Sequence, residues 1–205
     1  MPLLEHTLGI MLHPDEEWKA IRKEKYSFRQ VYLRHVPFLA LIPALSFLFG
    51  LTQVGWSIGS GEPIKLELWS AVQLCGLTYL SLLVGVYILG EYINWIARNY
   101  GVKDSEDRRH YEGTALAVYV TTPVFLAGIF GVYPDLWLNA AATFIAGAYA
   151  VYLIYEGIPI LMNISKEQAF MYATSVVTFG LVLMVVVRIG SVILWSFGVG
   201  PVYVD

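Results

Sequence analysis

The sequence predicts an all-α fold, a bundle of five transmembrane helices preceded by an amphipathic interfacial helix. Hydrophobic residues make up 57% of the 205 residues and charged residues only 14%, against about 25% in an ordinary soluble domain. Five stretches are apolar and long enough to cross a bilayer, whose core needs roughly 20 residues of helix. Backbone within hydrocarbon must satisfy its own hydrogen bonds, and these stretches lack the period-two alternation of barrel strands, so we expect helices.

The expected spans cover most of the chain. They are residues 36–56, 68–90 with a continuation to 97, 113–134, 136–155 with a continuation to 162, and 169–187 with a continuation to 197. At 1.5 Å per residue the last stretch is roughly 43 Å long. We therefore expect it to tilt, to break near Gly180 or Gly190, or to project beyond the membrane.

The distribution of basic residues predicts the orientation. Eleven of the 13 Lys and Arg residues lie in the N-terminal segment and in the second and fourth loops, whereas the opposite loops carry only Lys65. Short loops rich in Lys and Arg stay in the cytoplasm, so we expect the N-terminus inside and the C-terminus outside. The expected organisation is a cytoplasmic or interfacial segment (1–34), a transmembrane domain (35–198) and a short outer tail (199–205). Residues 1–10 do not read as a cleavable signal peptide.

The segment before the first span reads as an amphipathic helix. Its apolar contacts at helical spacing are Trp18, Ile21, Phe28, Val31 and Tyr32, and its cationic face holds Lys19, Arg22, Lys23 and Lys25. Pro14 suits the first helical position, and the acidic residues 15–17 favour a helix N-terminus. Two interpretations remain open. The helix lies on an anionic leaflet, or it packs as a cap under the bundle. In the first case the lipid contacts are Trp18, Lys19, Arg22 and Lys23, joined near the outer interface by Arg188, whose side chain is expected to snorkel toward the head groups.

Carboxylates within apolar stretches are expensive and therefore informative. Glu91, Glu112 and Glu156 all fall in the cytoplasmic half of their spans, and the triplet Tyr-Glu-Gly occurs at 111–113 and at 155–157. One interpretation is an intramembrane polar cluster that shares protons or binds a cation, formed by Glu91, Asn94, Glu112, Tyr155 and Glu156. The alternative is that each carboxylate is satisfied separately, by a tyrosine hydroxyl, a helix N-terminus or an arginine. Asp135 is expected to cap the fourth span.

Known catalytic signatures are missing from the sequence. It contains no HExxH, GxSxG, P-loop or CxxC motif, and Cys75 is its single cysteine. We therefore expect no enzyme and no cofactor, while a metal site stays undetermined. A net charge of −3 without a basic domain argues against nucleic acid as a partner.

Three motifs, in their order along five spans, resemble the bacterial Yip1-domain proteins. They are HPDEEWKAI (13–21), YEGTA (111–115) followed by Tyr119 and Thr122-Pro123, and YEGIP (155–159) preceded by Tyr152 and followed by SKEQA (165–169). The resemblance implies five helices with a cytoplasmic N-terminus. Eukaryotic relatives are implicated in vesicle trafficking and contact Rab-type GTPases and each other. The long polar N-terminal region of those relatives is missing here, which favours a bacterial inner-membrane member.

Two functions follow as hypotheses. The first is a non-enzymatic membrane organiser or protein-interaction scaffold, whose partners are the lipid bilayer and other membrane proteins or further copies of itself. Missing catalytic motifs, small loops and packing-rich helices favour it. The alternative is a small oligomeric proton or cation transporter or channel that uses Glu91, Glu112 and Glu156. A weaker third idea is a lipid-handling role through Arg188 and the basic N-terminal segment.

Overall fold

The computed structural model describes residues 2–24, 27–57, 62–198 and 200–204. These residues form seven α-helices and isolated β-bridges but no β-strand. Five helices are long and apolar enough to cross a membrane. The expected all-α fold with five spans is therefore confirmed.

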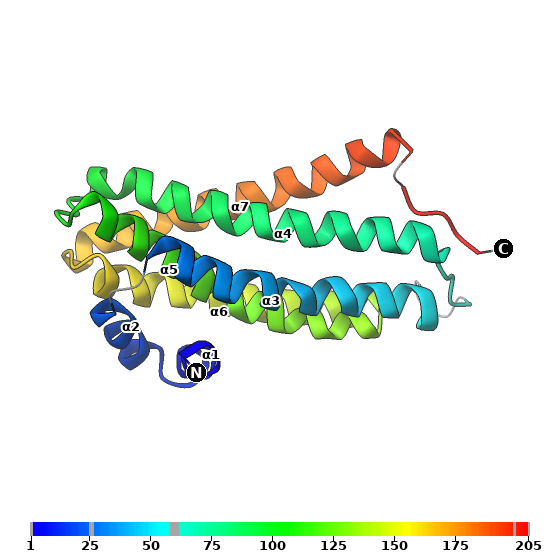
Figure 1. Cartoon of the computed structure of the whole chain (residues 1–205), viewed down its shortest axis with the longest axis horizontal. Coiled ribbons are helices and arrows are strands. Elements are labelled where there is room, and N and C mark those ends of the chain that lie inside the picture. The colour runs from blue at the N-terminus through cyan, green and yellow to red at the C-terminus, as the bar shows by residue number, and fades with distance from the viewer. Residues whose placement is uncertain (1, 25–26, 58–61, 199, 205) are drawn as a thin grey trace.

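The five spanning elements run along the long axis of the molecule (Figure 1). They are α3 (Phe28–Phe49) with a π-helical turn η1 (Gly50–Val54), α4 (Leu68–Ile96) with η2 (Ala97–Tyr100), α5 (Glu106–Ala127) with η3 (Gly128–Val132), α6 (Leu136–Leu161) and α7 (Lys166–Ser196). Helices α3 and α5 begin about two turns before the predicted spans. Their first turns carry arginines, so hydropathy alone places the helix starts too late.

Helix α5 forms the core of the bundle. Small side chains around its circumference let neighbouring helices approach from several sides, and 56% of its most apolar segment is buried. Its closest contact is with α4. A Cβ atom on Gly113 would lie 3.1 Å from the backbone nitrogen of Asn94 and 3.2 Å from the carbonyl oxygen of Gly90. Small residues such as Gly113 and Ala117 allow this close approach and suit the helix to a central position.

Glycines also bring α3 against the end of the third span. A Cβ atom on Gly50 would collide with the carbonyl oxygen of Gly131, and one on Gly128 would collide with the ring of Pro43. The ring of Phe47 packs on Gly131. The irregular turns η1 and η3 therefore meet backbone to backbone, which leaves no room for side chains there.

Helix α7 is continuous from Lys166 to Ser196 and does not break at Gly180 or Gly190. Its second half leans away from α4 (Figure 1). The expected break is therefore wrong, the lean relative to α4 agrees with a tilt, and projection beyond the membrane stays a prediction. Only 6% of its most apolar segment is buried, whereas Ala169, Tyr172, Ala173 and Val176 in its first turns pack into the core.

The N-terminal region is a pair of helices, α1 (Pro2–Leu12) and α2 (Pro14–Lys23). The sequence predicted one amphipathic segment that continued through Phe28, Val31 and Tyr32, and it did not predict α1. The structure corrects both points, because α2 ends at Lys23 and these three residues lie in α3. The predicted boundary at residue 34 therefore falls inside the first spanning helix, and Lys25 of the predicted cationic face lies outside the described residues.

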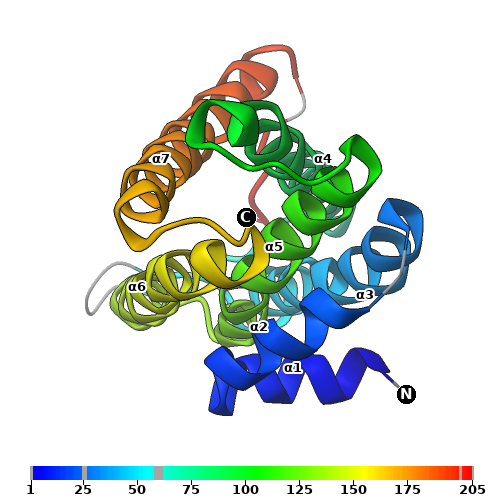
Figure 2. The ribbon, with the colours of Figure 1, turned by 90° about the vertical axis from the view of Figure 1, so that its left-hand side faces the viewer.

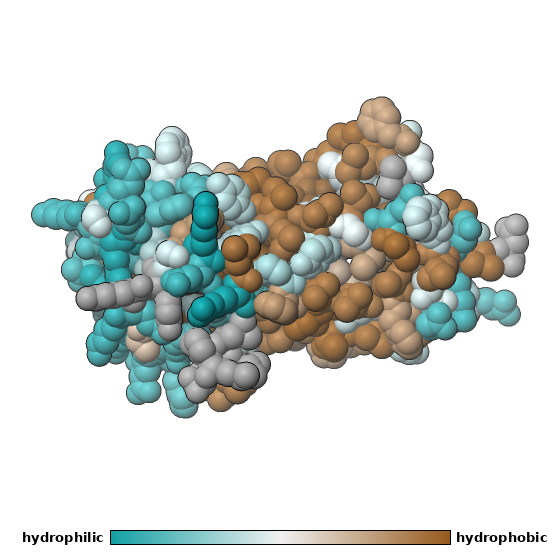
Figure 3. Space-filling model, in the orientation of Figure 1, coloured by the Kyte–Doolittle hydropathy of each residue, from teal (hydrophilic) through white to brown (hydrophobic). Residues whose placement is uncertain are grey.

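The two termini lie at opposite ends of the bundle (Figure 1). Helices α1 and α2 share one end, which we call the N-terminal end, with the connections at 101–105 and 162–165. This end is hydrophilic and is followed by an apolar belt (Figure 3). The arrangement agrees with five spans, whereas the cytoplasmic placement of this end stays a prediction from charge.

Within the predicted outer tail, residues 200–204 return to the start of α4, while 199 and 205 lie outside the described residues. The backbone nitrogen of Glu67 donates to the carbonyl oxygen of Val202 at 2.8 Å, and Ser70 donates to that of Gly200 at 3.0 Å. The tail thereby provides partners for polar groups at the first turn of α4.

The α3–η3 contact generates a stability prediction. Replacing Gly50 by alanine should lower the free energy of unfolding by about 1–3 kcal/mol, the usual cost of overpacking, because the new Cβ would meet the Gly131 carbonyl oxygen. Alanine at Gly147, where a Cβ meets nothing within 4 Å, should be neutral or slightly stabilising. Unfolding of both variants in detergent micelles checks this. Equal midpoints would contradict the close contact.

Candidate functional site

Helix α2 docks on the bundle through a buried tryptophan. Trp18 and Ile21 are fully buried. A Cβ atom on Gly157 of α6 would lie 2.7 Å from Cε2 of Trp18 and 2.9 Å from Cδ1 of Leu116 of α5, so glycine alone leaves space for the indole. The ring of Tyr119 meets the indole edge-on, with 6.2 Å between centroids. We call Leu116, Tyr119 and Gly157 the Trp18 socket.

The C-terminal end of α2 is held by side chains of α5. The last carbonyls of a helix have no intrahelical donor and need partners elsewhere. The hydroxyl of Tyr111 donates to the carbonyl oxygen of Ile21 at 2.9 Å. Arg108 donates to the carbonyl oxygen of Glu24 at 2.9 Å and to that of Arg22. Arg22 in turn donates to the carbonyl oxygen of Ile160 at the end of α6, at 2.6 Å.

Glu112 supports this arrangement from inside the bundle. Its side chain is fully buried, and Oε1 accepts from Nε of Arg108 at 2.6 Å. Among the described residues Oε2 has no hydrogen-bond partner. Because a buried carboxylate is costly without a cation, the ion pair fixes the Arg108 guanidinium at the point where it also holds α2.

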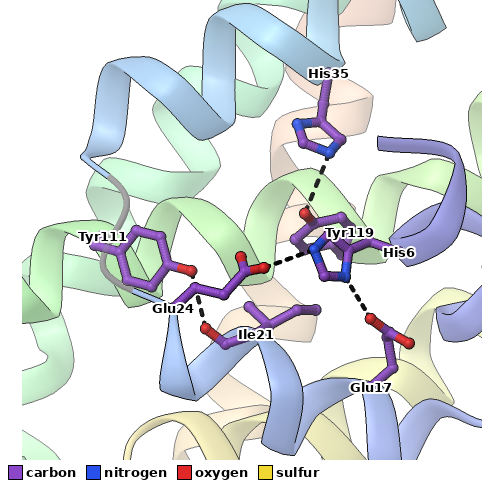
Figure 4. Close-up of polar contacts among 7 residues, drawn as sticks. All are labelled: His6, Glu17, Ile21, Glu24, His35, Tyr111 and Tyr119. Carbon is purple, nitrogen blue, oxygen red and sulfur yellow. Dashed lines mark hydrogen bonds and ion pairs between the residues drawn. The ribbon is translucent and has the colours of Figure 1, made fainter. Parts of the chain in front are cut away.

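A second polar contact joins α1 to α2 (Figure 4). The buried imidazole of His6 has Glu17 Oε1 at Nδ1 and Glu24 Oε1 at Nε2, the latter at 2.8 Å. The imidazole therefore joins two carboxylates of the α2 region through its two ring nitrogens. A Cβ atom on Gly9 would collide with the Glu17 carboxylate. The absence of a side chain at position 9 therefore lets Glu17 reach His6 across α1.

The same polar region continues to α3 (Figure 4). Nδ1 of His35 donates to the carbonyl oxygen of Val31 at 2.9 Å, which leaves Nε2 as the acceptor for the hydroxyl of Tyr119 at 3.2 Å. The Tyr119 ring also packs edge-on against His6, with 5.8 Å between centroids. One tyrosine of α5 thus contacts α1, α2 and α3.

The predicted carboxylate cluster is divided between different sides of α5. Glu91 pairs with His110 at 2.7 Å, where the His110 ring stacks on Phe28. Glu112 pairs instead with Arg108. Positions 110 and 112 of one helix point roughly 200° apart. A common depth in the membrane therefore did not bring Glu91 and Glu112 to one site.

The other three predicted members of the cluster, Asn94, Tyr155 and Glu156, do not join Glu91 or Glu112 through a hydrogen bond or ion pair among those described. Asn94 packs on Gly113, and the hydroxyl of Tyr155 lies 2.9 Å from Oγ1 of Thr174, linking α6 to α7. Glu156 is half-buried. The described residues contain no group of three or more His, Cys, Asp or Glu side chains that could hold a metal ion.

Of the predicted lipid contacts, some are engaged by protein and the others are exposed. Trp18 is enclosed by protein, so it does not face lipid, and Arg22 binds α6. Lys19 pairs with Asp15 at 3.6 Å on the exposed face of α2, where Lys23 is also exposed. Helix α2 packs as a cap on the bundle, and contact of its exposed basic face with the leaflet stays a prediction. Arg188 is exposed on α7, and its contact with lipid phosphate stays a prediction.

Comparison with known proteins identifies the family. The Yip1 domain matches residues 8–187, which include α2 and nearly the whole bundle. The chain belongs to the Yip1 family. It is 36% identical over 195 residues to the "Inner membrane protein YohC" of Escherichia coli (strain K12), covering 95% of this chain and 98% of that protein. YohC of Escherichia coli O6:H1 matches with the same identity and coverage. No solved structure matches.

These similarities and the five spans make the chain an integral inner membrane protein. In this Yip1-domain protein the three sequence motifs meet at one place. Residues 13–21 supply Trp18, residues 111–115 supply Tyr111 and Glu112, and residues 155–159 supply Gly157. The motifs therefore build the docking site of α2.

Sequence reasoning missed several members of this site. Arg108 was counted only as a loop charge, although its spacing of four residues from Glu112 is a visible ion-pair signal on a helix. His6 and His35 were not predicted as members of the site. Their contacts join helices distant in sequence, so no local signal could reveal them.

The socket makes a specific prediction for α2. Trp18→Ala should release the helix, because truncating a buried tryptophan costs about 3–5 kcal/mol. Trypsin should then cleave faster after Lys19, Arg22 or Lys23. Trp95→Ala is the matched control, since Trp95 on α4 is 73% exposed. Equal cleavage rates in both variants would show that Trp18 does not hold α2.

The buried ion pair makes a second prediction. Arg108→Met should lower the free energy of unfolding by about 3–5 kcal/mol, because it leaves Glu112 buried without its cation. The exposed pair Arg98–Glu106, at 3.6 Å, provides the comparison. Arg98→Met should change stability by less than about 1 kcal/mol. Denaturant titration in micelles measures both, and similar losses would argue against a structural role for the pair.

Proposed function

We propose that this Yip1-domain protein is a non-enzymatic membrane organiser that associates laterally with other membrane proteins or with further copies of itself. The observation that carries the proposal is the unequal burial of its spans. Within the most apolar segments, 56% of α5 is buried but only 6% of α7. Helix α7 thus offers an exposed apolar surface, which is most continuous along its second half.

The attachment of α7 supports this proposal. Its contacts with the bundle come from its first half, where Tyr172 donates to the carbonyl oxygen of Ile93 at 2.5 Å and Phe179 stacks on Tyr92 with 3.7 Å between centroids. Beyond Leu183 the large apolar side chains are exposed, among them Val186, Ile189 and Ile193. A Cβ atom on Gly190 would meet nothing within 4 Å, so a second helix has room to approach closely there.

The groove between α4 and α7 adds hydroxyl groups to this surface. It has a volume of about 370 Å³ and is lined by Tyr92, Thr174, Ser175, Thr178, Phe179 and Val182. Side-chain hydroxyls at membrane depth strengthen contacts between helices modestly, by about 0.6 kcal/mol each on average. The surface therefore combines shape and polar groups suited to a neighbouring helix.

The transporter alternative receives less support. It required Glu91, Glu112 and Glu156 to act together, and the first two bind His110 and Arg108 on different sides of α5. The described residues also offer no metal-binding group. A packed helix cap and an exposed lateral helix agree better with an organiser than with a cation path.

Cross-linking in native inner membranes tests the proposal. In a Cys75→Ser background, a benzophenone label on Ile189→Cys should give discrete cross-linked adducts, because this position lies on the exposed half of α7. Phe144→Cys on α6, 77% exposed, is the control position and should give none. A label at 189 that yields lipid adducts alone would overturn the proposal.

A further inference from the structure

Helix α1 lies across the bundle rather than along it. It is viewed end-on in Figure 1 and lengthwise after a rotation of 90° in Figure 2. If the five long helices cross the bilayer, the axis of α1 is parallel to the membrane plane. In Figure 1 α1 lies beside the bundle, and its last turn contacts Tyr149 of the spanning helix α6.

The two faces of α1 differ in what they contact. His6, Thr7 and Ile10 are buried against the protein. Leu8 and Leu12 lie one turn apart on the other face and are 60% and 69% exposed. The described residues leave these two leucines uncovered on the outer face of α1.

The inner face is fixed by contacts at both ends. His6 is held between Glu17 and Glu24. The hydroxyl of Tyr149 on α6 lies 3.1 Å from the carbonyl oxygens of both Ile10 and Met11, where the last turn of α1 needs donors. The rotation of α1 about its axis is therefore set, and with it the outward direction of Leu8 and Leu12.

We propose that α1 is an in-plane membrane helix whose Leu8 and Leu12 insert into the boundary between head groups and acyl chains. Helices of this kind rest about 5–10 Å deep in that boundary. Residues 2–12 contain no Lys or Arg, so the contact is with acyl chains and does not depend on anionic head groups. This assigns the lipid contact of the N-terminal region to α1, in place of Trp18 of α2, and it is independent of lateral association through α7.

Depth-dependent fluorescence quenching tests this inference on the full-length protein. Single cysteines replace Leu8 or Leu12 in the Cys75→Ser background, carry an NBD label and are reconstituted into phosphatidylcholine vesicles containing spin-labelled lipid. Both positions are exposed, so the substitutions spare the packed face. Glu16→Cys, on the exposed face of α2 at the same end, is the aqueous control, and Phe144→Cys is the control within a span.

The expected result is a depth of about 5–10 Å below the head groups for labels at 8 and 12, with loss of quenching by aqueous iodide. The depth should be the same when phosphatidylglycerol replaces part of the phosphatidylcholine. Two results would overturn the inference. One is iodide quenching equal to that at position 16, and the other is protection from both iodide and spin-labelled lipid, which indicates a protein contact such as a second copy.

Discussion

Carbonyl groups at helix ends need donors where water is scarce, and in this protein neighbouring helices supply them. Tyr149 serves the end of α1, Arg22 the end of α6, and Tyr172 the last turns of α4. Arg108 and Tyr111 serve the end of α2. Each such bond joins elements that are distant in sequence. The relative positions of the helices at the N-terminal end therefore depend on these few donors, since an unpaired buried carbonyl is expensive.

The central helix α5 makes this network compatible with close packing. Its first turns carry Arg108, Tyr111 and Glu112, which reach toward α2, while Gly113 allows α4 to pass at backbone distance. The polar first turns of α5 thus hold α2 at the N-terminal end, and its small residues let α4 pack closely farther along the helix. The Tyr-Glu-Gly triplet at 111–113 combines both tasks in this chain.

Hydropathy was sufficient to predict five helices, since a bilayer requires long apolar segments with internally bonded backbones. It placed the starts of α3 and α5 too late, because polar first turns carry no hydropathy signal. Asp135 was correctly predicted as a cap, and its Oδ1 accepts from the backbone nitrogen of Leu138 at 2.7 Å. The partners of Glu91 and Glu112 were not predictable, because depth along a helix says nothing about rotation around it. The environment of Trp18 could not be predicted, because an amphipathic pattern fits contact with lipid and contact with protein equally well. The space for its indole is left by Gly157, which is distant in sequence and adjacent only in the folded structure.

The position of the Trp18 socket on α5 and α6 has a consequence for biosynthesis. Arg22 binds Ile160, 138 residues later in the chain. At about 5–20 residues per second, α2 leaves the ribosome on the order of ten seconds before its binding site exists. Trp18 and Ile21 can therefore be buried in their final positions only after α5 and α6 have been made.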